Sequence, residues 1–305
     1  MAKQCRYCGK EADEDVLQCS QCGNELPELA RAEVAAVPPL LAPFDARNPS
    51  DAATPTAPDT YQALTARPAT LIFLGYFGAQ LAVGIMAGVI GFAITGGPLG
   101  GDREQLQRIT AMSALPIMVI SGFVMLKMAL ARVRPHLRDT APTGAAWTVG
   151  KLKENAFGVM AGVLTAMGYA FLINLFPPPD EMARGPLTRM AITPGAQQLV
   201  WVVVAILLAP IIEECLFRGI LYGGYRRSFG HTRATILSTF IFWALHLTET
   251  AQFWPAMAAI ATLALVALWF RLKFSAIGPA VAVHIGYNGF MVLGAIAYTL
   301  SVATE

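Results

Sequence analysis

The dominant feature of this sequence is a series of apolar segments, each close to the length that a membrane-spanning helix requires. A helix needs roughly 20 apolar residues to cross the hydrocarbon core of a bilayer. The chain is 55% hydrophobic and only 14% charged, whereas soluble domains have about 25% charged residues. We therefore predict an all-α polytopic membrane protein, a bundle of about seven transmembrane helices. The predicted segments are 69–96, 109–130, 155–176, 197–222, 234–250, 253–270 and 276–300.

Basic residues are distributed unevenly between the loops that join these segments. The loops after the second, fourth and sixth segments hold ten of them, and the opposite loops hold four. Because short cytosolic loops carry an excess of Lys and Arg, we expect a cytosolic amino terminus and a carboxyl tail on the other side. The ten are Arg132, Arg134, Arg138, Lys151, Lys153, Arg226, Arg227, Arg233, Arg271 and Lys273, and the four are Arg103, Arg108, Arg184 and Arg189.

Residues 1–26 contain two CxxC pairs, each followed by a glycine, and resemble the two knuckles of a zinc ribbon. The pairs are Cys5 with Cys8 and Cys19 with Cys22. Four thiolates can complete the tetrahedral shell of a structural zinc ion, and so short a segment needs the metal in order to fold. The alternative is two disulfides, which a reducing cytosol disfavours. We predict a small zinc ribbon with a structural zinc site.

A stretch rich in proline and alanine separates this segment from the apolar helices. Residues 27–68 have few aromatic side chains and no sustained helical period, a composition typical of a flexible linker. The predicted organisation is therefore a zinc ribbon (1–26), a disordered linker (27–68) and a transmembrane bundle (69–305).

The fourth apolar segment contains two adjacent carboxylates and an arginine. Charges at membrane depth are costly and usually mark a functional site. Glu214 and Arg218 are four residues apart, in the favourable order for an ion pair on one helical face. Glu213 points about 100° away and has no partner on its own helix, so it is suited to take a proton from water. The neighbouring Cys215 has no adjacent base, and we interpret it as an unreactive buried thiol.

Two further apolar segments each carry a histidine. His246 ends the stretch FWALH, and His284 begins the stretch HIGYN, in which Asn288 follows one turn later on the same face. A rise of about 1.5 Å per residue brings Glu213, His246 and His284 to a similar depth. Either histidine alone can be explained by a hydrogen bond between helices. Together with the glutamates they predict a polar site inside the membrane.

The three motifs together resemble those of a known family. EECLFRG, FWALH and HIGYN match the EExxxR, FxxxH and HxxxN motifs of the CPBP family, which includes the CAAX prenyl endopeptidases and the bacterial Abi proteins. The resemblance covers about residues 155–300, with the motifs in the family's order on separate segments. It implies an intramembrane endopeptidase of a bacterial plasma membrane. The implied substrate is a membrane-associated peptide or protein, either a CAAX-type prenylated tail or a small hydrophobic peptide such as a bacteriocin precursor.

The resemblance also implies a role for each motif residue. Glu213 would activate the attacking water, and His246 would help to hold it. His284 and Asn288 would stabilise the oxyanion. The Glu214–Arg218 ion pair would support the active site from behind. The implied catalytic residues are therefore Glu213, Glu214, Arg218, His246, His284 and Asn288.

A catalytic metal is a second option for the same residues, because Glu213, His246 and His284 could bind zinc, and the family is often labelled metalloprotease for that reason. A metal-free mechanism explains Asn288 better, since an asparagine amide is a poor zinc ligand and a good oxyanion donor. We therefore favour the metal-free mechanism.

A noncatalytic function is the main alternative. In this interpretation the protein is a membrane scaffold or a bacteriocin-immunity protein that recruits a cytosolic protein partner through the zinc ribbon. The ribbon is acidic between its knuckles, with Glu11, Asp13, Glu14 and Asp15 against Lys10, so we do not expect nucleic acid to be the partner. Intact motifs argue against a pure scaffold. An ion-coupled transporter finds no support, because internal repeats are lacking.

Overall fold

The computed structural model describes residues 3–4, 11–12, 61–95, 103–179 and 195–303. Two short strands, β1 (Lys3–Gln4) and β2 (Glu11–Ala12), pair antiparallel with Lys3 opposite Ala12. The four ribbon cysteines and most of the predicted linker lie outside the described residues. The zinc ribbon and the linker therefore remain predictions.

The rest of the described chain is helical, as predicted. Six stretches of it are long and apolar enough to cross a membrane, which makes the chain an integral membrane protein. Three of them are α1 (Ala66–Thr95), α2 (Arg103–Val133) and α3 (Leu152–Leu175). The fourth is continuous through α6 (Ala196–Val203), the π-helix η2 (Val204–Leu208), α7 (Ala209–Glu214), the π-helix η3 (Cys215–Leu221) and α8 (Tyr222–Phe229). The last two are α11 (Trp254–Phe274) and α12 (Ile277–Ala303).

The predicted fifth span, residues 234–250, differs from expectation, because it is not among the six spans found in the part of the chain that the structure describes. The helix is divided into α9 (His231–Leu245), of 15 residues, and the short α10 (Leu247–Thr250). At about 1.5 Å per residue, α9 falls short of the roughly 30 Å hydrocarbon core. The break is at His246, whose ring Nδ1–H donates to the Phe242 carbonyl while its backbone N–H bonds to Trp243 instead. The His246 imidazole therefore occupies the Phe242 carbonyl, which would accept from the His246 backbone N–H in a continuous α-helix. Hydropathy does not reveal such a break.

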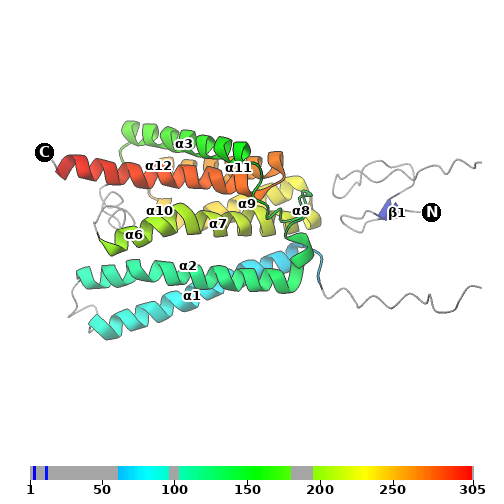
Figure 1. Cartoon of the computed structure of the whole chain (residues 1–305), viewed down its shortest axis with the longest axis horizontal. Helices are drawn as coiled ribbons and strands as arrows, with labels where there is room; N and C mark the ends of the chain where they lie inside the picture. Colours follow the sequence, from blue (N-terminus) through cyan, green and yellow to red (C-terminus); the bar gives the residue numbers. More distant parts are fainter. Residues whose placement is uncertain (1–2, 5–10, 13–60, 96–102, 180–194, 304–305) are drawn as a thin grey trace, which may run out of the picture.

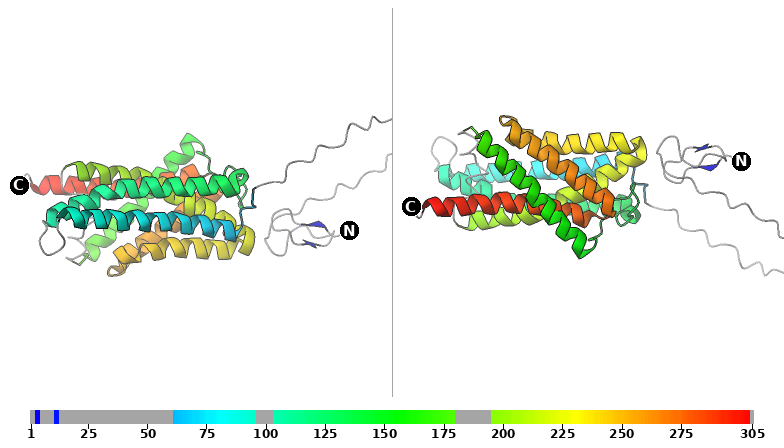
Figure 2. Two further views of the ribbon diagram at one scale, coloured as in Figure 1. Left: turned by 90° about the horizontal axis from the view of Figure 1, so that it is seen from below. Right: turned by 90° about the horizontal axis from the view of Figure 1, so that it is seen from above.

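The helices form an elongated bundle with the fourth span at its centre. In Figure 1 this span lies between the α1–α2 pair on one side and the group α3, α11 and α12 on the other, and the contacts between elements agree. Figure 2 shows α3 crossing over α12 and running alongside α11 on the outside of the bundle. The central position of the fourth span places its charged residues away from lipid.

Basic residues gather at one end of the bundle, where α2, α8 and α11 all finish. A small 3-10 helix, η1 (Arg134–His136), and the loop of residues 137–151 that leads to α3 lie at this end. We call this the basic end. The first turn of α1 is here too, because the Ala66 N–H donates to Ser228 Oγ at 2.9 Å. The opposite end holds the last turns of α12 (Figure 1).

Helix α1 begins at Ala66, two residues before the predicted linker boundary at Pro68, because proline is tolerated in the first turn of a helix. The preceding residues also belong to the bundle. Leu64 is fully buried, and the Gln62 N–H donates to the Arg132 carbonyl at 2.8 Å. The transmembrane unit thus includes the last residues of the predicted linker.

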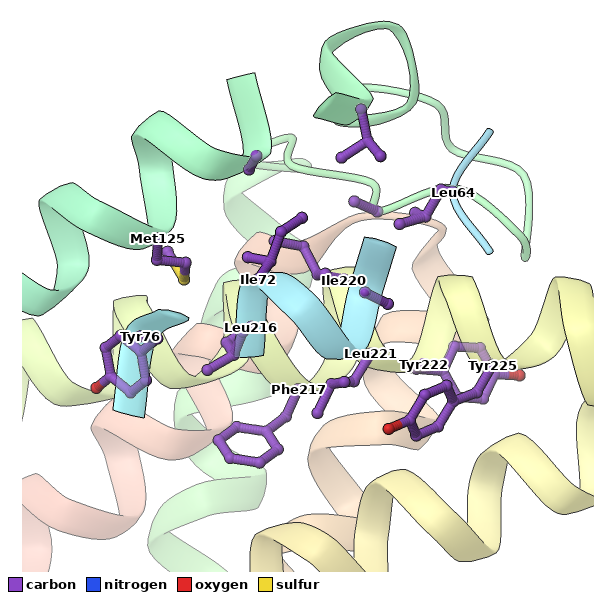
Figure 3. Close-up of a cluster of buried hydrophobic side chains, with 14 of the residues drawn as sticks. Leu64, Ile72, Tyr76, Met125, Leu216, Phe217, Ile220, Leu221, Tyr222 and Tyr225 are labelled. Carbon is purple, nitrogen blue, oxygen red and sulfur yellow. The ribbon is translucent and has the colours of Figure 1, made fainter. Parts of the chain in front are cut away.

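Apolar side chains pack between the α1–α2 pair and the second half of the fourth span. Figure 3 shows Ile72 of α1 and Met125 of α2 facing Leu216, Phe217 and Ile220 of η3. Since lipid tails are as apolar as these side chains, the helices associate mainly through close packing. This packing holds the fourth span against α1 and α2.

Helices α3 and α12 approach each other closely through small residues. A Cβ added to Gly162 of α3 would overlap the Val283 carbonyl oxygen of α12. Such small-residue contacts let two backbones approach closely in a membrane. The contact fixes α12, which carries two of the predicted site residues.

Candidate active site

Three of the predicted residues form a buried network at the centre of the bundle. Arg218 Nη1 donates to Glu214 Oε1 at 2.9 Å, and His284 Nδ1–H donates to the same oxygen at 2.9 Å. The side chains of Glu214, Arg218 and His284 are only 0%, 4% and 4% exposed. The network joins the fourth span to α12, so two distant motifs meet at one carboxylate oxygen.

Phe242 of α9 completes the surroundings of this network. Its ring lies 4.0 Å from the Arg218 guanidinium carbon, a cation–π contact. The same ring stands edge-on to His284, with centroids 6.0 Å apart, and lies 4.6 Å from the His246 ring. Phe242 is the phenylalanine of the FxxxH motif, and it brings α9 into the site through aromatic packing.

Glu213 lies beside the network and is free of it. Its side chain is 20% exposed, and its Oε2 lies 4.0 Å from His284 Nε2. This separation is too long for a direct hydrogen bond. Within the described part of the chain, its carboxylate has no shorter polar contact. The pair therefore presents two polar atoms at a separation that a water molecule can bridge.

His246 approaches the site only through the Phe242 ring. Its Nδ1–H donates to the Phe242 carbonyl at 2.8 Å, so in the neutral ring Nε2 carries the lone pair. No polar contact links His246 to Glu213 or His284 in the described structure. The structure thus brings the fourth span and α12 into direct contact and leaves His246 one aromatic ring away.

Asn288 is partly engaged with the backbone. Its Nδ2 donates to the Ala205 carbonyl of η2 at 2.8 Å, whereas the family resemblance implies that the amide faces the scissile carbonyl. An amide nitrogen has two hydrogens, so one remains for another acceptor. Asn288 therefore anchors the first half of the fourth span in addition to any role toward a substrate.

The carboxylates lie on a short α-helical segment between two π-helices. Helix α7, which ends at Glu214, follows η2 and precedes η3. Pro210 in the first turn of α7 has no N–H to continue the backbone ladder. A π-helix has a wider turn and is often found at functional sites. Side chains from other elements bond to carbonyls on both sides, Asn288 to Ala205 and Trp147 to Cys215.

Two residues at the site were not identified as functional from the sequence. Phe242 carried a signal, because it is the first residue of the FxxxH motif. Trp147 carried none, since it is an isolated tryptophan in the loop between α2 and α3, far in sequence from the motifs. Its contact with the Cys215 carbonyl depends on the folded arrangement alone.

The arrangement of the carboxylates and histidines in the described helices bears on the second option, a catalytic metal. In residues 61–95, 103–179 and 195–303, no group of three or more His, Cys, Asp or Glu side chains is placed to hold a metal ion. The candidate set of Glu213, His246 and His284 is split, because His246 is turned toward its own helix.

The comparison with protein families agrees with the motifs. Residues 195–290 match the family described as Type II CAAX prenyl endopeptidase Rce1-like. The matched stretch runs from the start of the fourth span to just beyond Asn288, and thus includes all three motifs. Comparisons with curated proteins and with solved structures gave no match. This matched core holds the carboxylates and histidines described above, and the match supports the resemblance of the core to the CPBP (CAAX protease) family of membrane proteins.

Proposed function

We propose that the protein is an intramembrane endopeptidase that hydrolyses a peptide bond of a membrane-associated substrate with water activated by Glu213. The observation that carries the proposal is the 4.0 Å separation between Glu213 Oε2 and His284 Nε2. A water oxygen can lie about 2.8 Å from both atoms at once, and a polar contact of this length is often bridged by water. Glu213 is also the more exposed of the two carboxylates, which gives it access to water.

The hydrogen-bond network sets the chemical state of His284. Because Nδ1–H donates to Glu214, Nε2 carries the lone pair in the neutral ring. His284 Nε2 accepts a hydrogen bond from one O–H of the water, and Glu213 removes the proton of the other O–H. The water oxygen then forms a bond to the carbonyl carbon. The proton on Glu213 passes to the leaving nitrogen as the C–N bond breaks.

The oxyanion is stabilised by the free hydrogen of the Asn288 amide. Its other hydrogen is held by the Ala205 carbonyl, which restricts the orientation of the amide. A preorganised donor of this kind contributes about 3 to 4 kcal/mol to transition-state stabilisation. His246 Nε2 is an acceptor on the other side of Phe242, and it holds water or a substrate N–H at the edge of the site.

Glu214 and Arg218 act as positioning residues. Glu214 holds the His284 ring in one tautomer, and Arg218 compensates the Glu214 charge in a site that excludes solvent. This division leaves Glu213 free to exchange protons. Two adjacent carboxylates thus have different roles, because Glu214 is bound through Oε1 to Arg218 and His284 and Glu213 is not.

The family match supports the substrate class. A CAAX-type tail carries a prenyl group on a cysteine three residues from its carboxyl end, so the lipid and the scissile bond reach the protein together. A small hydrophobic peptide, such as a bacteriocin precursor, meets the same site from within the membrane. We propose a cytosolic amino terminus in a bacterial plasma membrane, in keeping with the basic residues at one end of the bundle.

The test is Glu213→Gln, which keeps the shape of the side chain and removes the base. The purified protein is assayed in liposomes with an internally quenched peptide that carries S-farnesylcysteine in a CAAX tail, and membrane peptidomes are compared in parallel. We expect kcat to fall by about 10²- to 10⁴-fold with the melting temperature unchanged.

The matched control is Glu154→Gln in the first turn of α3. Glu154 accepts from the Lys151 N–H at 2.9 Å, and glutamine can retain such a cap. This variant should keep full activity. Cleavage retained by Glu213→Gln rejects the proposal. A phenotype that survives Glu213→Gln but is lost with residues 1–26 would favour the scaffold alternative.

A further inference from the structure

The loop between α2 and α3 contacts both elements that carry the buried network, the fourth span and α12. From its centre, Trp147 Nε1 donates to the Cys215 carbonyl at 3.1 Å. Cys215 follows Glu214 directly and is the first residue of η3. The indole therefore binds the backbone at the junction where the carboxylate-bearing helix widens.

The fourth span leaves space for this indole. A Cβ on Gly219, one turn beyond Cys215, would lie 2.7 Å from Trp147 Nε1 and 3.0 Å from the Ala145 carbonyl. Any larger side chain at this position would force the loop away from the helix. The absence of a side chain at Gly219 thus permits the contact with the indole.

The same loop also holds the start of α12. The Ile277 and Gly278 N–H groups donate to the carbonyls of Ala146 and Thr148 at 2.9 and 3.0 Å. These two acceptors flank Trp147 in sequence. His284 lies seven residues beyond Ile277, about 10 Å along the helix at 1.5 Å per residue. Residues 146–148 of the loop therefore contact both the fourth span, which carries Glu214, and α12, which carries His284.

The loop itself is firmly held. The Trp147 N–H donates to the Leu137 carbonyl at 2.6 Å, and Arg271 Nη2 of α11 donates to the Gly144 carbonyl at 2.9 Å. Ala146 is fully buried and has a φ of 49°, an uncommon conformation for a residue with a side chain. Such strain persists only where the surrounding structure imposes it and is concentrated at functional sites.

We propose that Trp147 is a positioning residue for catalysis, which sets the axial register between the Glu213–Glu214 segment and α12 by binding the Cys215 carbonyl. The inference rests on the proposed peptidase function. It assigns a role to a residue outside the family match of 195–290. If the Trp147–Cys215 contact is lost, the Glu214–His284 hydrogen bond and the Glu213–His284 separation change together. The attacking water is then no longer held between Glu213 and His284.

The main test is Trp147→Phe, which keeps an aromatic ring and removes the N–H donor. With the farnesylated CAAX peptide, we expect kcat to fall about 10- to 100-fold, as for a catalytic group displaced by about 1 Å, with KM changed by less than about twofold. The control is Trp269→Phe, because Trp269 is exposed on α11 and its ring lies against Lys273 and Phe270 of the same helix. Unchanged kcat in folded Trp147→Phe overturns the inference.

A second variant approaches the same contact from the other side. Gly219→Ala should displace the indole and reproduce the kcat loss, and the double variant should be no worse than the single ones, because both remove one interaction. Additive losses would overturn the inference. If neither variant folds in membranes, Trp147 has a purely structural role and the inference fails.

A readout without catalysis separates this inference from the proposed function. The rate of Cys215 alkylation by N-ethylmaleimide is measured by mass spectrometry of its peptide. Opening the junction should raise this rate several-fold in Trp147→Phe and leave it unchanged in Trp269→Phe. If wild-type protein cleaves no peptide and Glu213→Gln has no effect, the proposed function fails, while a faster Cys215 reaction still supports the contact. Equal alkylation rates together with unchanged kcat overturn the contact alone.

Discussion

The family-matched core, residues 195–290, and the helices that precede it bury different kinds of polar group. The core encloses Glu214, Arg218 and His284 in one charged network. A part-buried polar contact in the preceding helices joins neutral groups, the Gln80 amide and the Tyr76 hydroxyl at 2.8 Å. The core therefore holds the buried charges, whereas α1, α2 and α3 pack around it. Trp147 and Gly162 are two of the positions at which the preceding region contacts the core.

The largest expected effect on stability concerns the buried charges of the core. Arg218→Met leaves Glu214, whose side chain is 0% exposed, without its cation. Removing one partner of a buried ion pair costs about 3 to 5 kcal/mol, and we expect a loss of this size in thermal unfolding of the purified protein.

Two further variants sharpen this expectation. Arg218→Met combined with Glu214→Gln should recover much of the stability, because no uncompensated charge remains. Arg67→Met makes the same substitution at an exposed position of α1 and should change stability by less than about 0.5 kcal/mol. Equal losses in Arg218→Met and Arg67→Met would remove the distinction between the two regions.

The next effect concerns the contact between α3 and the core. Gly162→Ala places a methyl group against the Val283 carbonyl of α12, and such overpacking costs about 1 to 3 kcal/mol. Because α12 carries His284, we also expect lower activity in the folded fraction. Both are measured with the liposome assay and a melting curve.

Gly168→Ala on the same helix is the matched control. A Cβ there would meet nothing within 4 Å, and replacing glycine with alanine inside a helix stabilises it by roughly 0.5 to 1 kcal/mol. If Gly162→Ala is as well tolerated as Gly168→Ala, α3 does not set the position of α12.

The smallest effect on activity is expected from removal of residues 1–26. We propose that Cys5, Cys8, Cys19 and Cys22 hold a structural zinc, so the full chain should contain about one zinc ion and the truncated chain none, with kcat unchanged. Metal content is measured by elemental analysis before and after a chelator. Stoichiometric metal in an active truncated protein, lost together with activity in chelator, would overturn the metal-free mechanism.

The sequence was informative wherever a local rule relates residues on one helix. Hydropathy identified the helical spans, and the four-residue spacing predicted the Glu214–Arg218 pair that the structure contains. The motif resemblance selected the family that the match to residues 195–290 supports. These predictions succeed because helical periodicity and the exclusion of charge from lipid act on neighbouring residues.

Hydropathy failed where a side chain competes with the backbone. The fifth span was predicted as one helix and is divided at His246, because the imidazole occupies the Phe242 carbonyl. Asn288 was assigned to the oxyanion from the resemblance, and its bond to the Ala205 carbonyl is a further contact that spacing does not reveal. Each of these two differences depends on which backbone carbonyl accepts a single side-chain hydrogen bond.

By itself, the sequence determined that this chain is a membrane-embedded helical bundle, which residues carry charge inside it, and which family its core resembles. Only the tertiary structure decided that Glu214 is shared by Arg218 and His284, that Glu213 is left beside them, and that Trp147 reaches the backbone at Cys215. The physical reason is the separation along the chain between the residues that interact. Composition and periodicity act along one helix, whereas these contacts join residues that are up to 70 positions apart.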